Sequence, residues 1–437
     1  MAILILCIGI VLLVVLIAGL RFNAFLAFIV VSLFIGLLNG MSAADTTASL
    51  QKGVGDILGS LVLILGFGAM LGKLIAESGA AQQIATGLMH AFGKKYLLWA
   101  LVLTAFIIGI PLFYGVGFVL IVPLVITISY KYDIPAVYIG LPMLAALSVT
   151  HGYLPPHPSP TALVKQYNAD MGKTLFYGFL IAVPAIVIAG PLFAQLLKKY
   201  TVKPLAVFAA PPRPDNELPG LFNSIFTSCL PVLLIALATI VKLLVPHPNM
   251  VSRVLMALGD PVIALLIAVL YAVYSLGLQR GKKIKDIMEL LADAVKQIAM
   301  ILFIIGGAGA LKQVLTDSGT SNQITQSLLA LHVHPLLAAW SISAIIRVAL
   351  GSSTVAGLTT AGVIAPLILT SHVDPNLMVL ATGAGSLVFS HVNDPGFWMF
   401  KEYFNLSLKD TLKTWSVMET IVALVGLAGV FIINSFL

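Results

Sequence analysis

Long apolar runs separated by short polar segments make up most of this chain. A helix needs about 20 apolar residues to cross the hydrocarbon core of a bilayer. The pattern predicts apolar helical segments over 3–20, 23–40, 57–76, 97–130, 135–150, 174–197, 224–245, 255–278, 297–315, 335–370, 375–392 and 415–436. Two of these runs are too long for one crossing, and small or helix-breaking residues interrupt each near its middle. Each is therefore predicted to be a re-entrant helical hairpin.

The chain reads as two similar halves joined by one polar segment, 198–220. GFGAMLGKLIAESGAAQQIA (66–85) aligns with GGAGALKQVLTDSGTSNQIT (306–325) at an offset of 240 residues. The same offset pairs Gly117 with Gly357, Pro135 with Pro375, His151 with His391 and Pro155 with Pro395. So many matches at one offset indicate an internal duplication, a common construction in secondary transporters.

The predicted halves are residues 1–197 and 221–437. The first contains a hairpin at 97–130 and a broken helix at 135–160, and the second contains a hairpin at 335–370 and a broken helix at 375–398. Each half then has five crossings, and an odd number inverts the second half relative to the first. With the 198–220 linker in the cytoplasm, fifteen Lys and Arg residues fall in inside loops and five in outside loops, as the positive-inside rule requires. Both termini are predicted to face outside.

The composition supports a polytopic all-helical membrane protein. Of the 437 residues, 59% are hydrophobic and only 9% are charged, whereas an ordinary soluble domain is about a quarter charged. This composition excludes a soluble enzyme, a nucleic-acid binder and a disordered chain. The net charge of +7 is interpreted as topogenic, because Lys and Arg fall at the ends of the apolar runs.

Irregular backbone at membrane depth is tolerated only inside protein or beside a watery cavity, so the interrupted segments are where a site is expected. They are 110–117 and 150–160 in the first half, and 350–357 and 390–398 in the second. Hairpin tips expose backbone N–H groups and helix N-termini, which favour an anion. The predicted substrate-binding residues are Tyr114, Gly115, His151, Arg347, Gly351, Ser352, Ser353, Thr354, His391 and Asn393.

Arg347 lies in an apolar run, one helical turn before the second hairpin tip. A charge at the bilayer centre costs roughly 2.5–3.5 kcal/mol on insertion scales, so it persists with a partner or a function. Its planar fork suits a substrate carboxylate. The structural alternatives are an ion pair with an acid such as Asp394 and a side chain that extends to the interface.

His151, His391 and Asp394 occupy the broken segments. The histidines either contact substrate, titrate near neutral pH, or bond freed carbonyl groups and hold the break together. Asn393–Asp394–Pro395 is a turn signal, so Asp394 either ends a helix or carries a proton as a buried carboxylate. Proton coupling is assigned to Asp394 or to one of the two histidines.

Three segments together resemble the gluconate permease (GntP) family. They are the duplicated GAMLGKLIAESGAAQQIA helix, RVALGSSTVAG, and SHVNDPGFW followed by KEYFNLS. The resemblance covers essentially the whole chain. It implies membership of a larger ion-transporter superfamily of dimeric carriers, in which inverted repeats each contribute a hairpin and a broken helix and substrate moves by an elevator-like displacement.

The resemblance also implies a proton-coupled importer of gluconate or a related hydroxy acid in a bacterial inner membrane, with no cofactor. The second tip reads LGSST where QGSAT-like sequences are expected in many relatives, and Leu350 removes an amide near the site. The preferred acid therefore stays open, because similar family members carry D-serine, glycerate or keto-sugar acids.

Other classes of protein fit the sequence less well. A channel needs a continuous polar pore, whereas these polar residues cluster at two midplane breaks. An intramembrane enzyme needs a nucleophile–base set or a metal site, and the chain has no HExxH or GxSxG motif. A carrier of the same fold driven by sodium stays open, because the hairpin-tip hydroxyls and carbonyls also suit Na⁺.

Overall fold

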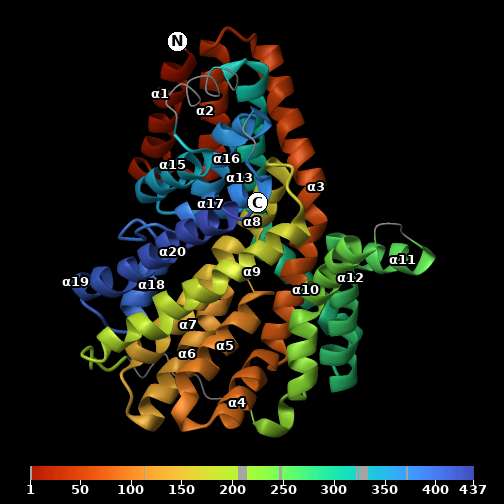
Figure 1. Cartoon of the computed structure of the whole chain (residues 1–437), viewed down its shortest axis with the longest axis vertical. Helices are drawn as coiled ribbons and strands as arrows, with labels where there is room; N and C mark the ends of the chain where they lie inside the picture. The colour runs from red at the N-terminus through yellow and green to blue at the C-terminus, as the bar shows by residue number, and fades with distance from the viewer. Residues whose placement is uncertain are drawn as a thin grey trace.

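The chain folds into an elongated bundle of helices (Figure 1). The computed structural model describes residues 2–112, 114–204, 214–245, 249–320, 323, 333–370 and 373–437. Within these ranges, seven helical stretches are long and apolar enough to cross a membrane. The all-helical membrane class predicted from the sequence is confirmed.

The described helices fall into two sets, one on each side of the polar segment. The first set is α1 (Ala2–Val14), α2 (Ala24–Leu38), α3 (Ala43–Glu77), α4 (Ala80–Phe92), α5 (Leu97–Gly109), α6 (Tyr114–Tyr132), α7 (Ala136–Tyr153), α8 (Pro158–Gln166) and α9 (Met171–Val187). The second set is α10 (Leu221–Leu244), α11 (Met250–Leu258), α12 (Pro261–Ala272), α13 (Ile284–Asp317), α15 (Pro335–Leu350), α16 (Ser353–Thr370), α17 (Pro375–Gly385), α18 (Pro395–Tyr403), α19 (Leu408–Thr411) and α20 (Val417–Asn434).

Both overlong apolar runs are helical pairs with a break between them. The first breaks between α5 and α6, and the second at Gly351 and Ser352, between α15 and α16. Figure 1 shows α5 and α6 near the lower end of the long axis and α15 and α16 in the upper part. The inverted orientation of the halves stays a prediction, and residues 205–213 of the linker lie outside the described residues.

Two long helices, α3 and α13, cross closely. A Cβ atom added at Gly53 would overlap the backbone of Gly309 and Ala310, and one added at Gly309 would overlap the backbone of Gly53. Small residues let helix backbones approach in a membrane, where van der Waals packing drives association. We call this closely packed pair the α3–α13 spine, and Figure 1 shows α3 running along one side of the molecule.

Several predicted helix bounds were wrong. Helix α3 begins at residue 43 instead of 57, and α13 begins at 284 instead of 297. Hydropathy marks only the apolar part of a helix, whereas capping sets where it starts: Ser42 Oγ accepts a hydrogen bond from the N–H of Asp45 at 3.1 Å. Helix α4 was not predicted.

The predicted run 255–278 is also two helices instead of one. Asp260 ends the first element and caps the second, because its Oδ1 accepts from the N–H of Val262 at 3.0 Å. Pro261 is the first residue of α12, a position at which its missing N–H costs nothing.

The broken helices α7–α8 and α17–α18 position the interior polar groups. Nearly every residue of α7 is buried, and α17 is buried from Asn376 to Gly385. Each second piece begins with proline, Pro158 in α8 and Pro395 in α18. Proline cannot donate a backbone hydrogen bond, so it starts a helix readily after a break. The breaks therefore place freed backbone groups at the centre of the molecule.

Asp170 joins the two halves at the start of α9. Its Oδ1 accepts from the N–H of Lys173 at 2.9 Å, and its Oδ2 accepts from Lys242 Nζ of α10 at 2.9 Å. Burial raises the pKa of Asp170, but the hydrogen bonds from Lys173 and Lys242 and the charge of Lys242 outweigh burial, so the pKa lies below its ordinary value. The ionised form therefore stabilises the fold above about pH 4, and this contribution is lost as pH falls through the lowered pKa.

We expect Asp170→Ala to destabilise the purified protein by about 1 kcal/mol at pH 7, since it removes a helix cap and a partly exposed ion pair. Asp170→Asn keeps the cap and should lose only the smaller ion-pair part. Thermal unfolding in detergent measures both effects, and the deficit of each variant should shrink below about pH 4. Equal melting temperatures of Asp170→Ala and the parent protein at pH 7 would contradict this assignment.

Candidate functional site

A cavity of about 290 Å³ lies where both hairpins and both broken helices meet. Its walls come from the start of α6, the last turns of α7, the α15–α16 turn, the start of α18 and the α20 region. The lining residues are Tyr114, Gly115, Ser148, His151, Arg347, Gly351, Ser352, Ser353, Thr354, Leu387, Asp394, Pro395, Gly396, Met399, Trp415 and Glu419. Nine of the eleven residues predicted from the sequence, including Asp394, are among them; His391 and Asn393 are not.

Arg347 is buried and forms an ion pair with Asp394. The Arg347 side chain is 4% exposed, and its Nη2 donates to Asp394 Oδ2. Its Nε has no hydrogen-bond partner in the part of the chain that the structure describes. An unpaired buried donor carries a desolvation cost, so part of the guanidinium is available to a ligand in the cavity. The ion pair named as the structural alternative is therefore present, and it uses only one nitrogen of the fork.

Asp394 is held from several directions. Its Oδ2 also accepts from Ser390 Oγ, and its Oδ1 accepts from the N–H of Gly396 at 2.8 Å, which caps α18. Trp415 Nε1 in turn donates to Ser390 Oγ at 2.8 Å. Both carboxylate oxygens of Asp394 are thus engaged, as expected for a helix-capping group that fixes Arg347.

The second hairpin tip presents hydroxyl groups to the cavity. Gly351 adopts φ +74°, a left-handed conformation that ends α15. Ser352 Oγ accepts from the N–H of Val355 at 3.3 Å and caps α16, while Ser353 Oγ lies 2.8 Å from Ser386 Oγ. The start of α16 is therefore a capped helix N-terminus that points its dipole toward the cavity.

His391 and Asn393 support this tip from behind. Asn393 Nδ2 donates to the carbonyl of Val348 at 2.8 Å, and His391 Nε2 lies 3.0 Å from the same carbonyl oxygen. Both side chains satisfy the end of α15, where carbonyl groups lack helical partners. Their observed contacts match the scaffold alternative for His391.

His151 lies against the first hairpin. Its ring centroid is 5.7 Å from that of Tyr114 and 5.6 Å from that of His157. His157 Nε2 lies 2.6 Å from the carbonyl oxygen of Gly109, at the end of α5. Two buried polar atoms, His151 Nδ1 and Tyr114 Oη, have no hydrogen-bond partner within the described ranges. They add polar groups to the wall opposite the second tip.

Glu419 is a buried acid that the motif analysis missed. It is 2% exposed, it lines the cavity, and its Oε1 accepts from Ser148 Oγ at 2.5 Å. Its Oε2 forms no hydrogen bond with any residue that the structure describes. A signal was present in the sequence, since a glutamate inside the apolar run 415–436 is costly at membrane depth. Glu419 lies outside the four interrupted segments, so the motifs there do not point to it.

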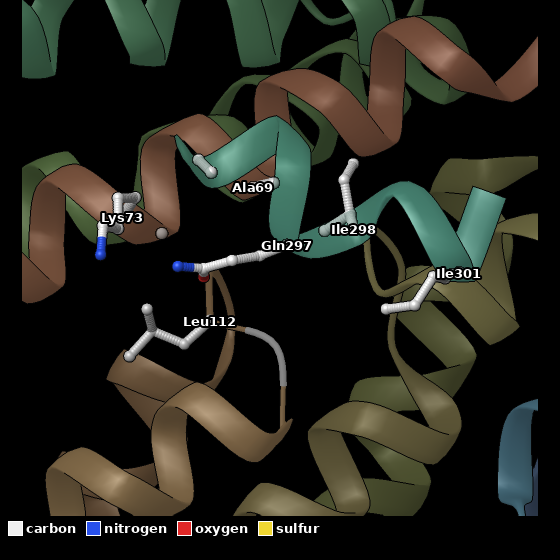
Figure 2. A pocket seen from close by; sticks show the side chains of 8 residues that line it. Ala69, Lys73, Leu112, Gln297, Ile298 and Ile301 are labelled. Carbon is white, nitrogen blue, oxygen red and sulfur yellow. The ribbon is translucent and has the colours of Figure 1, made fainter. Parts of the chain in front are cut away.

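A second, smaller cavity of about 70 Å³ lies between α3, α13 and the turn after α5. Figure 2 shows Lys73 of α3 and Gln297 of α13 reaching into the same space, with Leu112 of the turn on the other side. Ligand pockets are usually about 300–1,000 Å³, so this space is too small for a sugar acid. The larger cavity is the candidate site.

The larger cavity combines one cation, two acids, hydroxyl groups and a helix N-terminus. Such a set suits an anionic ligand with several hydroxyl groups. In the described part of the chain, no group of three or more His, Cys, Asp or Glu residues could hold a metal ion. These groups can hold a ligand through hydrogen bonds and charge alone.

The sequence of this chain is similar to those of known permeases and transporters. Residues 1–436 match the model of the GntP family permeases. The chain is 50% identical over 436 residues to a high-affinity gluconate transporter of Escherichia coli (strain K12), covering 99% of both chains. It is 48% identical over 438 residues to the L-idonate transporter of the Gnt-II system of the same organism, covering 100% of both. A gluconate permease of Bacillus subtilis (strain 168) is 44% identical over 445 residues, with 99% of both covered.

Two solved structures share the fold. The Alcanivorax borkumensis YdaH transporter has a TM-score of 0.67 at 16% identity, covering 94% of this chain and 97% of its own. Neisseria gonorrhoeae MtrF, described as one of a class of antimetabolite efflux pumps, has a TM-score of 0.64 at 13% identity, with 94% of each covered.

Proposed function

The chain belongs to the GntP permease family and is a membrane transporter, not an enzyme; on this premise we propose that it imports gluconate or a closely related sugar acid together with a proton. The substrate class is inferred from the partly unpaired guanidinium of Arg347, which lines the same cavity as the hydroxyl groups of the α15–α16 turn. A carboxylate would accept from Arg347, and the hydroxyl groups would exchange hydrogen bonds with a polyol chain.

The cavity volume supports a small ligand. At about 290 Å³ it lies near the lower end of the range for small-molecule sites. Two of the relatives named above transport gluconate and L-idonate according to their names, and both substrates are six-carbon acids. The same scaffold with D-serine, glycerate or another small carboxylate is the alternative, and sodium in place of the proton is a second one.

We infer an elevator-type displacement, in which the hairpin tips and broken helices move as a unit past the α3–α13 spine. The protein is placed in a bacterial inner membrane as a homodimer with both termini outside and the central linker in the cytoplasm. Accessibility of single introduced cysteines at each terminus tests the topology, and a mass measurement by light scattering in detergent tests the dimer.

Purified protein in liposomes is expected to accumulate labelled gluconate when a pH gradient, acid outside, is imposed without sodium. A sodium gradient at equal pH on both sides should give no accumulation. Uptake driven by the sodium gradient alone would show that the coupling ion is sodium and not a proton. Failure of either gradient to drive gluconate, with D-serine or glycerate accumulating instead, would overturn the substrate assignment.

A further inference from the structure

Glu419 differs from Asp394 in what its two oxygens do. Glu419 Oε1 accepts one hydrogen bond from Ser148, whereas Oε2 is buried and has no hydrogen-bond partner among the described residues. Asp394, by contrast, has both oxygens engaged by Arg347, Ser390 and the N–H of Gly396. A proton can therefore reside on Glu419 Oε2 without breaking an existing contact, whereas a proton on Asp394 would compete with its ion pair.

The charges around Glu419 are few. Arg347 of α15 and Asp394 before α18 line the same cavity as Glu419, as does Tyr114 of α6. Among the described residues, the other elements packed against α20 bring no charge to this wall, since His334 before α15 contacts Phe431 near the far end of α20. Helix α17 has no titratable side chain, and Lys173 at the start of α9 and Lys413 before α20 are exposed.

His151 is the remaining titratable group on this wall. It lines the same cavity and lies beside Tyr114. With Arg347 positive and Asp394 negative, these two charges offset each other. Glu419 is then the group whose protonation decides whether the empty cavity is neutral or carries a net negative charge.

The negative charge of the substrate interacts with the charge on the Glu419 carboxyl group. If Glu419 is ionised, a bound monocarboxylate adds a second negative charge in a water-poor space, and the two repel. If Glu419 is protonated, the occupied cavity loses that repulsion. Proton and anion therefore favour each other's binding, and linkage requires the effect to be reciprocal.

We propose that Glu419 is the residue that carries the co-transported proton and that Ser148 positions its carboxyl group. This rests on the proposed proton symport. With the cavity open to the outside, Glu419 Oε2 takes a proton from water and the anion binds. With the cavity open to the cytoplasm, the anion leaves and the proton returns to water. One proton and one negative charge cross together, so the step is electrically neutral.

The test uses Glu419→Gln, which keeps an oxygen to accept from Ser148 but cannot release a proton. Glu402→Gln is the matched control, because Glu402 is exposed and pairs only with its neighbour Lys401. Both variants and the parent are placed in liposomes with the membrane potential held at zero. Two activities are measured, gluconate counterflow and accumulation driven by a pH gradient.

We expect the parent and Glu402→Gln to show both activities. With a gradient of about two pH units, a one-to-one symport has a limit near 100-fold accumulation, since each unit is worth tenfold. Glu419→Gln should retain counterflow within about threefold of the parent and lose accumulation, reaching only equal concentrations. A membrane potential, positive inside, should now drive gluconate uptake by Glu419→Gln, because the anion moves without a proton.

A second variant separates a chemical role from a structural one. Glu419→Asp keeps a carboxylic acid and should restore accumulation at a reduced rate. Accumulation by Glu419→Gln at the parent level would overturn the assignment of Glu419, as would loss of counterflow in Glu419→Gln. If the parent itself fails to accumulate under a pH gradient, the proposed proton symport fails instead, so the two failures are distinguishable.

Discussion

Replacing Arg347 with lysine is expected to raise the KM for gluconate uptake at least tenfold, a loss of about 1.4 kcal/mol of binding free energy. Arg347 binds Asp394 through Nη2 and leaves Nε free, so one planar group can serve the acid and a ligand together. A lysine ammonium is a single point of charge and cannot present two parallel donors. The lysine keeps the positive charge that pairs with Asp394 but loses the planar pair of donors.

The competing ligand gluconamide separates substrate contact from scaffolding. If Arg347 grips the carboxylate, Arg347→Lys should narrow the preference for gluconate over its uncharged amide in competition assays, in addition to raising KM. Arg253→Lys is the control, because Arg253 lies exposed on α11 and should leave both values unchanged. A parent-like KM in Arg347→Lys would return Arg347 to a purely structural role with Asp394.

Gly351→Ala is expected to reduce gluconate uptake by about 100-fold or more, because displacements of about 1 Å at a reacting or binding centre can have effects of this size. Gly351 has φ +74°, which costs a side-chain-bearing residue roughly 1 kcal/mol or more. A Cβ at this position would also overlap the carbonyl and side chain of Asn393. The α15–α16 turn must then move, and the hydroxyl groups of Ser352 and Ser353 move with it.

Gly66→Ala is the control for this substitution. Gly66 lies in α3 and is not part of the cavity wall, and a Cβ added there meets none of the described atoms within 4 Å. It should support uptake within about threefold of the parent, since open space accepts a methyl group without strain. Uptake by Gly351→Ala at the parent rate would contradict this prediction. It would show that the α15–α16 turn tolerates a shift and that its geometry does not determine the rate of transport.

The fold class and the positions of the helix breaks could be read from the sequence because their signals are local. Apolar length identifies membrane helices, and glycine and proline mark where a helix stops and starts again, as at Gly351 and Pro395. Helix ends were harder, because polar turns of a helix leave no hydropathy signal. The start of α3 at residue 43 depends on the Ser42 cap.

Most of the candidate site was also accessible to motif reasoning. Arg347, Asp394 and the Ser352–Ser353–Thr354 tip were identified as unusual groups at breaks, and the structure brings them to one cavity. His391 and Asn393 carry the same kind of signal yet lie behind the tip, because which side of a turn a residue faces depends on the neighbouring helices. Whether any of these residues contacts substrate is what the Arg347 and Gly351 variants measure.

The sequence by itself determined that this is a polytopic helical membrane protein, where its helices break, and which family it resembles. Only the tertiary structure decided which polar groups meet. Ser148 and Glu419 are 271 residues apart and form a hydrogen bond, and neither stands out in its own helix as the partner of the other. Hydropathy and breaking signals act along the chain, whereas contact between helices depends on their rotation and crossing, which packing of the whole bundle sets.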